Sequence, residues 1–262
     1  MCIEGSVGRG CANSAPDVKT VQVLLTLNWK RLSGVTPLAV DGVIGAHTVE
    51  AIAAFQTQVM GLAAADGRIE PGGVALKALA GGMTPEFSAE KLRGIMVNAA
   101  QESADTYARI LTPKMAARAI NTPLRQAHFL AQLGHESGEL RYTEELASGE
   151  AYERRTDLGN TEPGDGRKFK GRGLIQLTGR TNYKAYGDAI GINLLDGDNC
   201  RRLATDPDLA VDVACWFWET RGLSLLADQD DVRMITRRIN GGLNGLADRE
   251  RQLARGKFFL VA

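Results

Sequence analysis

A carboxylate stands at the end of an otherwise apolar helical pattern in TPLRQAHFLAQLGHESGEL, residues 122–140. Asn121 or Thr122 can cap the start of this helix, and Gly138 favours a stop. Glu136 then falls in the last turn, where free backbone carbonyls and apolar neighbours disfavour a charged carboxylate. We therefore expect Glu136 to hold its proton near neutral pH, as a general acid must. An exposed glutamate at a helix end is the simpler interpretation of this position alone.

A second carboxylate would allow hydrolysis of a glycosidic bond, with about 6.5–9.5 Å between the carboxyls when a water must fit opposite the leaving group. Glu145 is the first candidate and Glu144 the next. On one continuous helix, Glu136 and Glu145 would be separated by about 13 Å of rise and would lie on opposite faces. The chain must therefore break after Glu136 and fold back, which Gly138 permits. The alternative is a solvated acidic surface.

Polar and aromatic residues of the kind that bind sugars follow in FKGRGLIQLTGRTNYKAYG, residues 169–187. Amides and hydroxyls at Gln176, Thr178 and Asn182 suit sugar hydroxyl and N-acetyl groups, and Tyr183 can cover a ring face. The alternative is that these residues form a polar loop whose glycines have only a structural role.

A third cluster, RRINGGLNGLADRER at residues 237–251, contains Asn240, a glycine pair and Arg249. The glycine pair would let the backbone approach a ligand closely. His128 and His135 lie seven residues apart on one helix face, but a zinc site needs at least one more ligand, and none is obvious. We expect no metal or other cofactor, and we expect His135 to form a hydrogen bond near Glu136.

The composition is that of an ordinary globular protein, with 44% apolar residues, 31 basic and 31 acidic residues among 262. This balance argues against a nucleic-acid partner. No apolar run approaches the ~20 residues of a membrane span. The first residues lack the basic start and apolar core of a signal peptide, so we expect synthesis in a cytoplasm and later release to the cell wall. The four cysteines fit no zinc pattern, and we expect reduced thiols, with a Cys2–Cys11 or Cys200–Cys215 disulfide as the alternative.

The sequence divides at GGMTPEFSAE, residues 81–90, where helical periodicity lapses. We predict a domain at residues 1–82, a linker at 83–90 and a second domain at 91–262, both mainly α-helical. The first domain should contain three helices, with similar Asp-Gly turns, DGVIGAHT and DGRIEPGG, between them. Gly42 and Gly67 can adopt positive φ in these turns, and Ile44 and Ile69 can enter the core.

The run DGVIGAHTVEAIAAFQ, followed by DGRIEPGGVALKAL, resembles the peptidoglycan-binding domain of many cell-wall hydrolases over residues 7–80. The motifs GHESG, GRGLIQLTGRTNY and INGG, in this order, resemble glycoside hydrolase family 19, the chitinase-like branch of the lysozyme superfamily, over residues 92–259. More closely, the chain resembles modular phage endolysins. It has Gly138 and Glu139 where plant family members have two glycines, and a short segment separates the two candidate carboxylates.

The resemblance implies a lysozyme-like, mostly helical hydrolase domain in which Glu136 is the general acid and Glu145 the general base. Thr178 would help to hold the attacking water, and Arg249 would orient the acidic network. The predicted catalytic residues are thus Glu136, Glu145 and Thr178. The predicted substrate-binding residues are Gln176, Asn182, Tyr183, Asn240, Arg249 and His135.

The resemblance further implies an endolysin that hydrolyses the β-1,4 bond between N-acetylmuramic acid and N-acetylglucosamine with inversion. Peptidoglycan would contact both domains of a monomer, with no membrane partner. A chitinase acting on N-acetylglucosamine polymers and a non-catalytic wall-binding protein are the alternatives.

Overall fold

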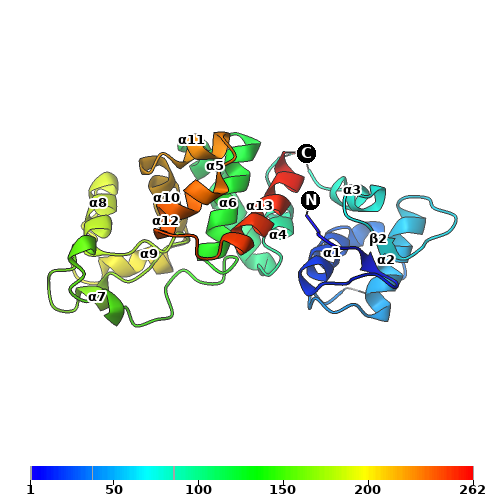
Figure 1. Cartoon of the computed structure of the whole chain (residues 1–262), viewed down its shortest axis with the longest axis horizontal. Helices are drawn as coiled ribbons and strands as arrows, with labels where there is room; N and C mark the ends of the chain where they lie inside the picture. The colour runs from blue at the N-terminus through cyan, green and yellow to red at the C-terminus, as the bar shows by residue number, and fades with distance from the viewer. Residues whose placement is uncertain (1, 37, 85, 262) are drawn as a thin grey trace.

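The computed structural model describes residues 2–36, 38–84 and 86–261. These residues form helices α1 to α13, short 3₁₀ helices and one two-stranded sheet, which confirms the mainly α fold class. Figure 1 shows an elongated molecule, with α1, α2 and α3 at one end, α7 and α8 at the other, and α13 alongside α4 and α6 between them. Both termini lie near the middle of its length.

The N-terminal part contains the three predicted helices, α1 (Ala15–Leu27), α2 (Ala46–Gln58) and α3 (Val74–Ala80). The first helix ends at Leu27, and the chain then continues into a 3₁₀ turn at Trp29–Arg31. The sequence did not predict the antiparallel pairing of β1 (Val7–Gly8) with β2 (Arg68–Ile69).

Each Asp-Gly turn is held by a glutamine from the preceding helix. Gln22 accepts a hydrogen bond from the Gly42 N–H and donates one to Asp41. Gln56 makes the same two bonds with Gly67 and Asp66. The similar turns are therefore one structural motif used twice. Both glycines have positive φ, +81° at position 42 and +68° at position 67, as predicted. Of the two isoleucines, Ile69 is fully buried and Ile44 packs at the edge of the core.

The boundary region joins α3 to α4 (Ala89–Ile95), which Ser88 caps by accepting a hydrogen bond from the Lys91 N–H. The helix thus begins inside the range predicted as a linker, and the division into domains at these residues stays a prediction. Helix α1 packs against α4, so the two parts of the chain are in contact.

The larger, C-terminal part is built around α6 (Pro123–Glu136), which packs along α13 (Leu246–Leu260). Small residues allow the close approach, because a Cβ at Gly256 would lie 3.1 Å from Ala127. On another side of α6, Phe129 meets the fully buried Trp218 edge to face, with ring centroids 5.3 Å apart. The remaining helices are α5 (Gln101–Ala117), α7 (Asp165–Lys168), α8 (Arg180–Ile190), α9 (Arg202–Thr205), α10 (Pro207–Thr220), α11 (Leu223–Asp228) and α12 (Val232–Asn240). Further 3₁₀ turns lie at Glu150–Tyr152, Thr156–Leu158 and Asn199–Arg201.

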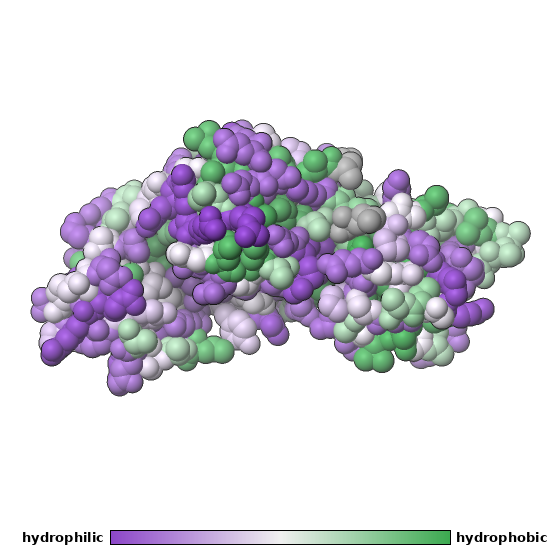
Figure 2. All heavy atoms as spheres, in the orientation of Figure 1, coloured by the Kyte–Doolittle hydropathy of each residue, from purple (hydrophilic) through white to green (hydrophobic). Residues whose placement is uncertain are grey.

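The surface is mainly hydrophilic on the face drawn in Figure 2, where hydrophobic residues form small separate patches. Within the described ranges, none of the helices has the length and apolar character needed to cross a bilayer. All four cysteines are free thiols, and Cys2, Cys200 and Cys215 are buried.

Candidate active site

Helix α6 ends at Glu136, as the sequence predicts. Thr122 caps its first turn by accepting a hydrogen bond from the Arg125 N–H at 3.2 Å. Ser137 closes the last turn, and both its N–H and its hydroxyl donate to the Leu133 carbonyl. The side chain of Glu136 is 17% exposed. The predicted acid is therefore held at a helix end with part of its surface open to solvent.

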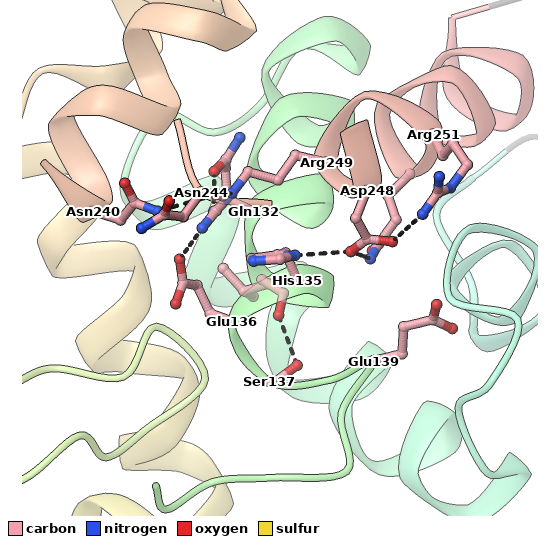
Figure 3. Close-up of polar contacts among 12 residues, drawn as sticks. Gln132, His135, Glu136, Ser137, Glu139, Asn240, Asn244, Asp248, Arg249 and Arg251 are labelled. Carbon is pink, nitrogen blue, oxygen red and sulfur yellow. Dashed lines mark hydrogen bonds and ion pairs between the residues drawn. The ribbon is translucent and has the colours of Figure 1, made fainter. Parts of the chain in front are cut away.

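Arg249 is the direct partner of Glu136. Its guanidinium is almost fully buried, with one nitrogen 2.5 Å from Glu136 Oε1 and another 2.5 Å from Gln132 Oε1 (Figure 3). Arg249 Nε also donates to the Asn244 carbonyl. The buried guanidinium therefore holds Oε1 of the Glu136 side chain in a fixed position. The orienting role implied for Arg249 has the geometry it requires.

His135 faces Asp248 rather than Glu136. Its Nδ1 lies 2.8 Å from Asp248 Oδ2, and this hydrogen bond lowers the pKa of Asp248 to about 2 (Figure 3). Gly245 touches the imidazole so closely that an added Cβ would lie 2.0 Å from His135 Cε1. Asp248 and Arg249, which are consecutive in α13, therefore bind His135 and Glu136, which are consecutive in α6. His135 therefore helps to hold α6 against α13. The hydrogen bond that was expected near Glu136 is the one between His135 and Asp248.

Asn240 orders the loop between α12 and α13. Its Nδ2 donates to the Asn244 carbonyl at 3.1 Å, and its Oδ1 accepts from the Gly242 N–H at 2.8 Å. Gly241, with φ of +77°, ends α12 in the left-handed conformation that glycine adopts without strain. The same Asn244 carbonyl accepts a hydrogen bond from Arg249 Nε. Asn240 is therefore connected to Glu136 indirectly, through Asn244 and Arg249.

The chain reverses direction after Glu136, as the separation of the two candidate carboxylates requires. Gly138, Glu139 and Leu140 all have φ near +60°, so three successive residues are left-handed. The segment then runs to Glu144, which forms an antiparallel bridge with Arg172. Glu145 is therefore presented from a loop and not from the end of α6.

The two carboxylate oxygens of Glu145 accept from neutral donors, while Lys170 Nζ donates to its backbone carbonyl at 2.8 Å. Its Oε1 accepts from the Tyr152 hydroxyl at 3.0 Å and its Oε2 from the Gly171 N–H at 3.1 Å. Burial and this carboxylate raise the pKa of Tyr152, so the hydroxyl stays a donor. Glu144 instead forms an ion pair with Arg172 at 2.9 Å. A half-buried carboxylate without a cation on it suits a general base better than one that holds an arginine.

Gln176 and Glu145 meet at Gly171. A Cβ on Gly171 would lie 2.8 Å from Gln176 Oε1 and 3.3 Å from Glu145 Oε2, so only glycine leaves both side chains in place. The Thr178 hydroxyl donates to the Gln176 carbonyl at 2.9 Å, and Asn182 donates to the Thr178 carbonyl at 2.7 Å. The predicted amide and hydroxyl residues therefore form one hydrogen-bonded group beside Glu145.

Tyr183 does not have the exposure that sugar stacking requires. Its side chain is fully buried, its hydroxyl donates to the Lys170 carbonyl at 2.7 Å, and its ring packs on Phe169. The prediction that Tyr183 contacts substrate is therefore not supported. Tyr183 supports the loop from behind, because it lies on the buried inner face of α8.

A path of hydrogen bonds links the group beside Glu145 to α12, the helix that precedes the loop containing Asn244. Arg221 donates to Asn182 Oδ1 at 3.5 Å, and the Arg221 carbonyl accepts from Arg238 of α12 at 3.0 Å. Sequence reasoning did not identify the supporting residues Gln132, Tyr152, Asn244 and Asp248. In the parts of the chain that the structure describes, no group of three or more metal-binding side chains gathers.

Comparisons with known proteins find two families in the chain. The family described as "Chitinase class I" matches residues 125–227, and "Putative peptidoglycan binding domain" matches residues 14–72. A glycosyl hydrolase family 19 domain-containing protein of Haemophilus influenzae is 36% identical over 157 residues, which cover 48% of this chain and 75% of that protein. An endochitinase of Arabidopsis thaliana is 38% identical over 117 residues, 44% of this chain, but only 39% of the plant protein is covered.

The fold also agrees with solved structures. Chitinase C from Streptomyces griseus superposes with a TM-score of 0.54 and 26% identity, over 67% of this chain and 77% of that one. A bacterial family 19 chitinase superposes with a TM-score of 0.53 and 24% identity, over 66% of this chain and 94% of that one. The chain belongs to glycoside hydrolase family 19 and carries a peptidoglycan-binding domain before its hydrolase domain.

Proposed function

We propose that this glycoside hydrolase cuts the β-1,4 bond between N-acetylmuramic acid and N-acetylglucosamine in peptidoglycan. The observation that carries the proposal is the pairing of a peptidoglycan-binding domain with the family 19 domain in one chain. A domain that holds the enzyme on the wall raises the local concentration of wall glycan around the active site. This advantage would be absent for a substrate that the first domain does not bind.

In the proposed mechanism, Glu136 gives a proton to the oxygen of the leaving sugar. Arg249 contacts Glu136 at Oε1, so Oε2 is the oxygen that can carry the proton. Glu145 takes a proton from a water that attacks the anomeric carbon from the opposite side. The neutral donors Tyr152 and Gly171 fix both Glu145 oxygens without neutralising their charge. Thr178, next to this carboxylate in the hydrogen-bonded group, would help to hold the water.

A chitinase is the second candidate, because the plant relative and the two bacterial proteins of solved structure are chitinases. The test offers purified peptidoglycan and colloidal chitin side by side and measures new reducing ends. We expect at least about ten-fold faster release from peptidoglycan, since only this substrate engages both domains. Mass spectrometry should find N-acetylmuramic acid at the new reducing ends. Faster release from chitin, or N-acetylglucosamine at the ends released from peptidoglycan, would reject the proposed substrate or bond.

The proposed setting is that of an endolysin that is made in a cytoplasm and reaches the wall through a membrane pore such as a holin. The wall-binding domain supports action at the wall, and its N-terminal position is similar to that of endolysins that act on Gram-negative walls. Expression with a pore-forming protein should lyse the producing cells, whereas expression alone should not. Lysis without the pore would contradict this release route.

A further inference from the structure

The turn that follows Glu136 is held in an unfavourable backbone conformation. Glu139 and Leu140 have φ of +60° and +66°, a region in which residues with a Cβ are strained. Such a conformation persists only where the surroundings hold it in place. Because this turn sets the direction of the chain between Glu136 and Glu145, the contacts that hold it also affect the relation between the two carboxylates.

The Glu139 side chain makes the contacts that hold the turn. It is 7% exposed, and its two oxygens accept from the backbone N–H of Asn98 at 2.5 Å and from Asn98 Nδ2 at 3.0 Å. In Figure 3 it points away from Glu136, towards the segment that connects α4 and α5. This carboxylate therefore anchors the turn to a neighbouring loop, and it is not directed at Glu136.

Asn98 also contacts the peptidoglycan-binding domain. Its Oδ1 accepts a hydrogen bond from Lys19 Nζ at 2.8 Å, and Lys19 belongs to α1. The alkyl chain of Lys19 lies against the first Asp-Gly turn, where a Cβ at Gly42 would be 3.1 Å from Lys19 Cγ. A single asparagine thus links the binding domain, through one lysine, to the turn that follows Glu136.

Arg255 of α13 adds a charge on the other side of the same junction. It is 5% exposed, and together with Arg251 it faces Cys2, Asp17 and other residues of the first domain. Burial lowers the pKa of Arg255, while the nearby Glu139 carboxylate acts in the opposite direction. Glu139 thus has a hydrogen-bonding partner in Asn98 and a compensating positive charge in Arg255, and both of these residues also border the first domain.

We propose that Glu139 is a positioning residue for hydrolysis, and that docking of the peptidoglycan-binding domain through Lys19 and Asn98 supports it. The contact keeps the strained turn in the geometry that places Glu136 relative to Glu145. This inference rests on the proposed function, because it takes these two carboxylates as the acid and the base. It gives the first domain a role in the catalytic step in addition to holding the wall.

The test begins with Glu139→Gly and Glu139→Gln in the full chain. Glycine accepts positive φ but removes the anchor, so the variant should fold and lose the fixed turn. Glutamine keeps the size, but its amide nitrogen cannot accept from Asn98. We expect kcat on peptidoglycan to fall roughly 10- to 100-fold for Glu139→Gly and less for Glu139→Gln, because small misplacements of reacting groups have effects of this order. KM and binding to sedimented cell walls should change little.

The interdomain contact is tested with Lys19→Met, and Lys30→Met is its matched control. Lys30 is an exposed lysine in the same domain, just after α1. Lys19→Met should lower kcat about two- to five-fold, as expected for one exposed hydrogen bond, and Lys30→Met should not. The double variant Lys19→Met with Glu139→Gly should be no slower than Glu139→Gly alone, because both changes act through one contact.

Several outcomes would overturn the inference. These are an unchanged kcat in folded Glu139→Gly, a change confined to KM or wall binding, or losses that multiply in the double variant. Thermal melting of each variant shows whether it is folded. If Glu139→Gly folds poorly, the kcat values of Glu139→Gln and Lys19→Met decide the test. The variant Glu136→Gln distinguishes a failure of the proposed function from a failure of this inference. If it stays active, the proposed function fails; if it is inactive while the Glu139 and Lys19 variants match the wild type, only this inference fails.

Discussion

Replacing Glu136 with glutamine will lower kcat on purified peptidoglycan by about 10²- to 10⁴-fold, the range expected for loss of a general acid. Glutamine has the same shape and can still accept a hydrogen bond from Arg249, so the packing of α6 and α13 is preserved. It cannot give a proton to the leaving oxygen. The measurement is the release of reducing ends under saturating substrate.

The control for this variant is wall binding, measured by sedimentation with cell walls. Binding should equal that of the wild type, because α1 and α2, which lie in the matched peptidoglycan-binding region at residues 14–72, are at the end of the molecule away from α6 (Figure 1). A variant that binds walls and retains more than about a tenth of the wild-type kcat would contradict the assignment of Glu136 as the acid.

Replacing Glu145 with glutamine will have an effect of the same order, about 10²- to 10⁴-fold in kcat. The amide can still accept from Tyr152 or from the Gly171 N–H through its one oxygen, but it cannot take a proton from water. The measurement is again reducing-end release from peptidoglycan, made at several pH values so that a shifted optimum is not mistaken for inactivity.

The matched control is Glu144→Gln, one residue away on the same loop. Glu144 is 43% exposed and pairs with Arg172, so its loss should reduce kcat less than about ten-fold, through modest loosening of the loop. If Glu144→Gln were the more damaging change, the role of base would pass to Glu144.

The helices around the site were predictable where local signals define them. Thr122 and Gly138 bracket α6 through capping chemistry that acts within a few residues, and the helix ends where those signals place it. The reversal after Glu136 followed from an argument about distance along a helix, and the structure contains it. The resemblance supplied Arg249, which local patterns would not have connected to Glu136.

The partners within the site were not predictable, because they come from distant parts of the chain. His135 and Asp248 are 113 residues apart, and Gln132 and Arg249 are 117 apart. No periodicity within one segment indicates such a pairing. For the same reason, the pattern of residues 122–140 gave no sign that a guanidinium from α13 contacts Glu136.

Burial explains the remaining difference. The tyrosine of the NY motif was expected to cover a sugar ring, but Tyr183 lies on the inner face of α8 and is fully buried. Composition suggests which residues suit a sugar site, whereas the helix period decides which of them face the solvent. Asn182, one position earlier, remains partly exposed.

The most direct test of the central claim, that Glu136 and Glu145 act on opposite sides of the bond with a water between them, is the anomeric form of the first product. Proton nuclear magnetic resonance, recorded on a soluble wall glycan before mutarotation, distinguishes the two anomers. We predict that the α-anomer appears first, because direct attack by water inverts a β-linkage. Initial accumulation of the β-anomer would contradict it and would require a covalent or substrate-assisted intermediate.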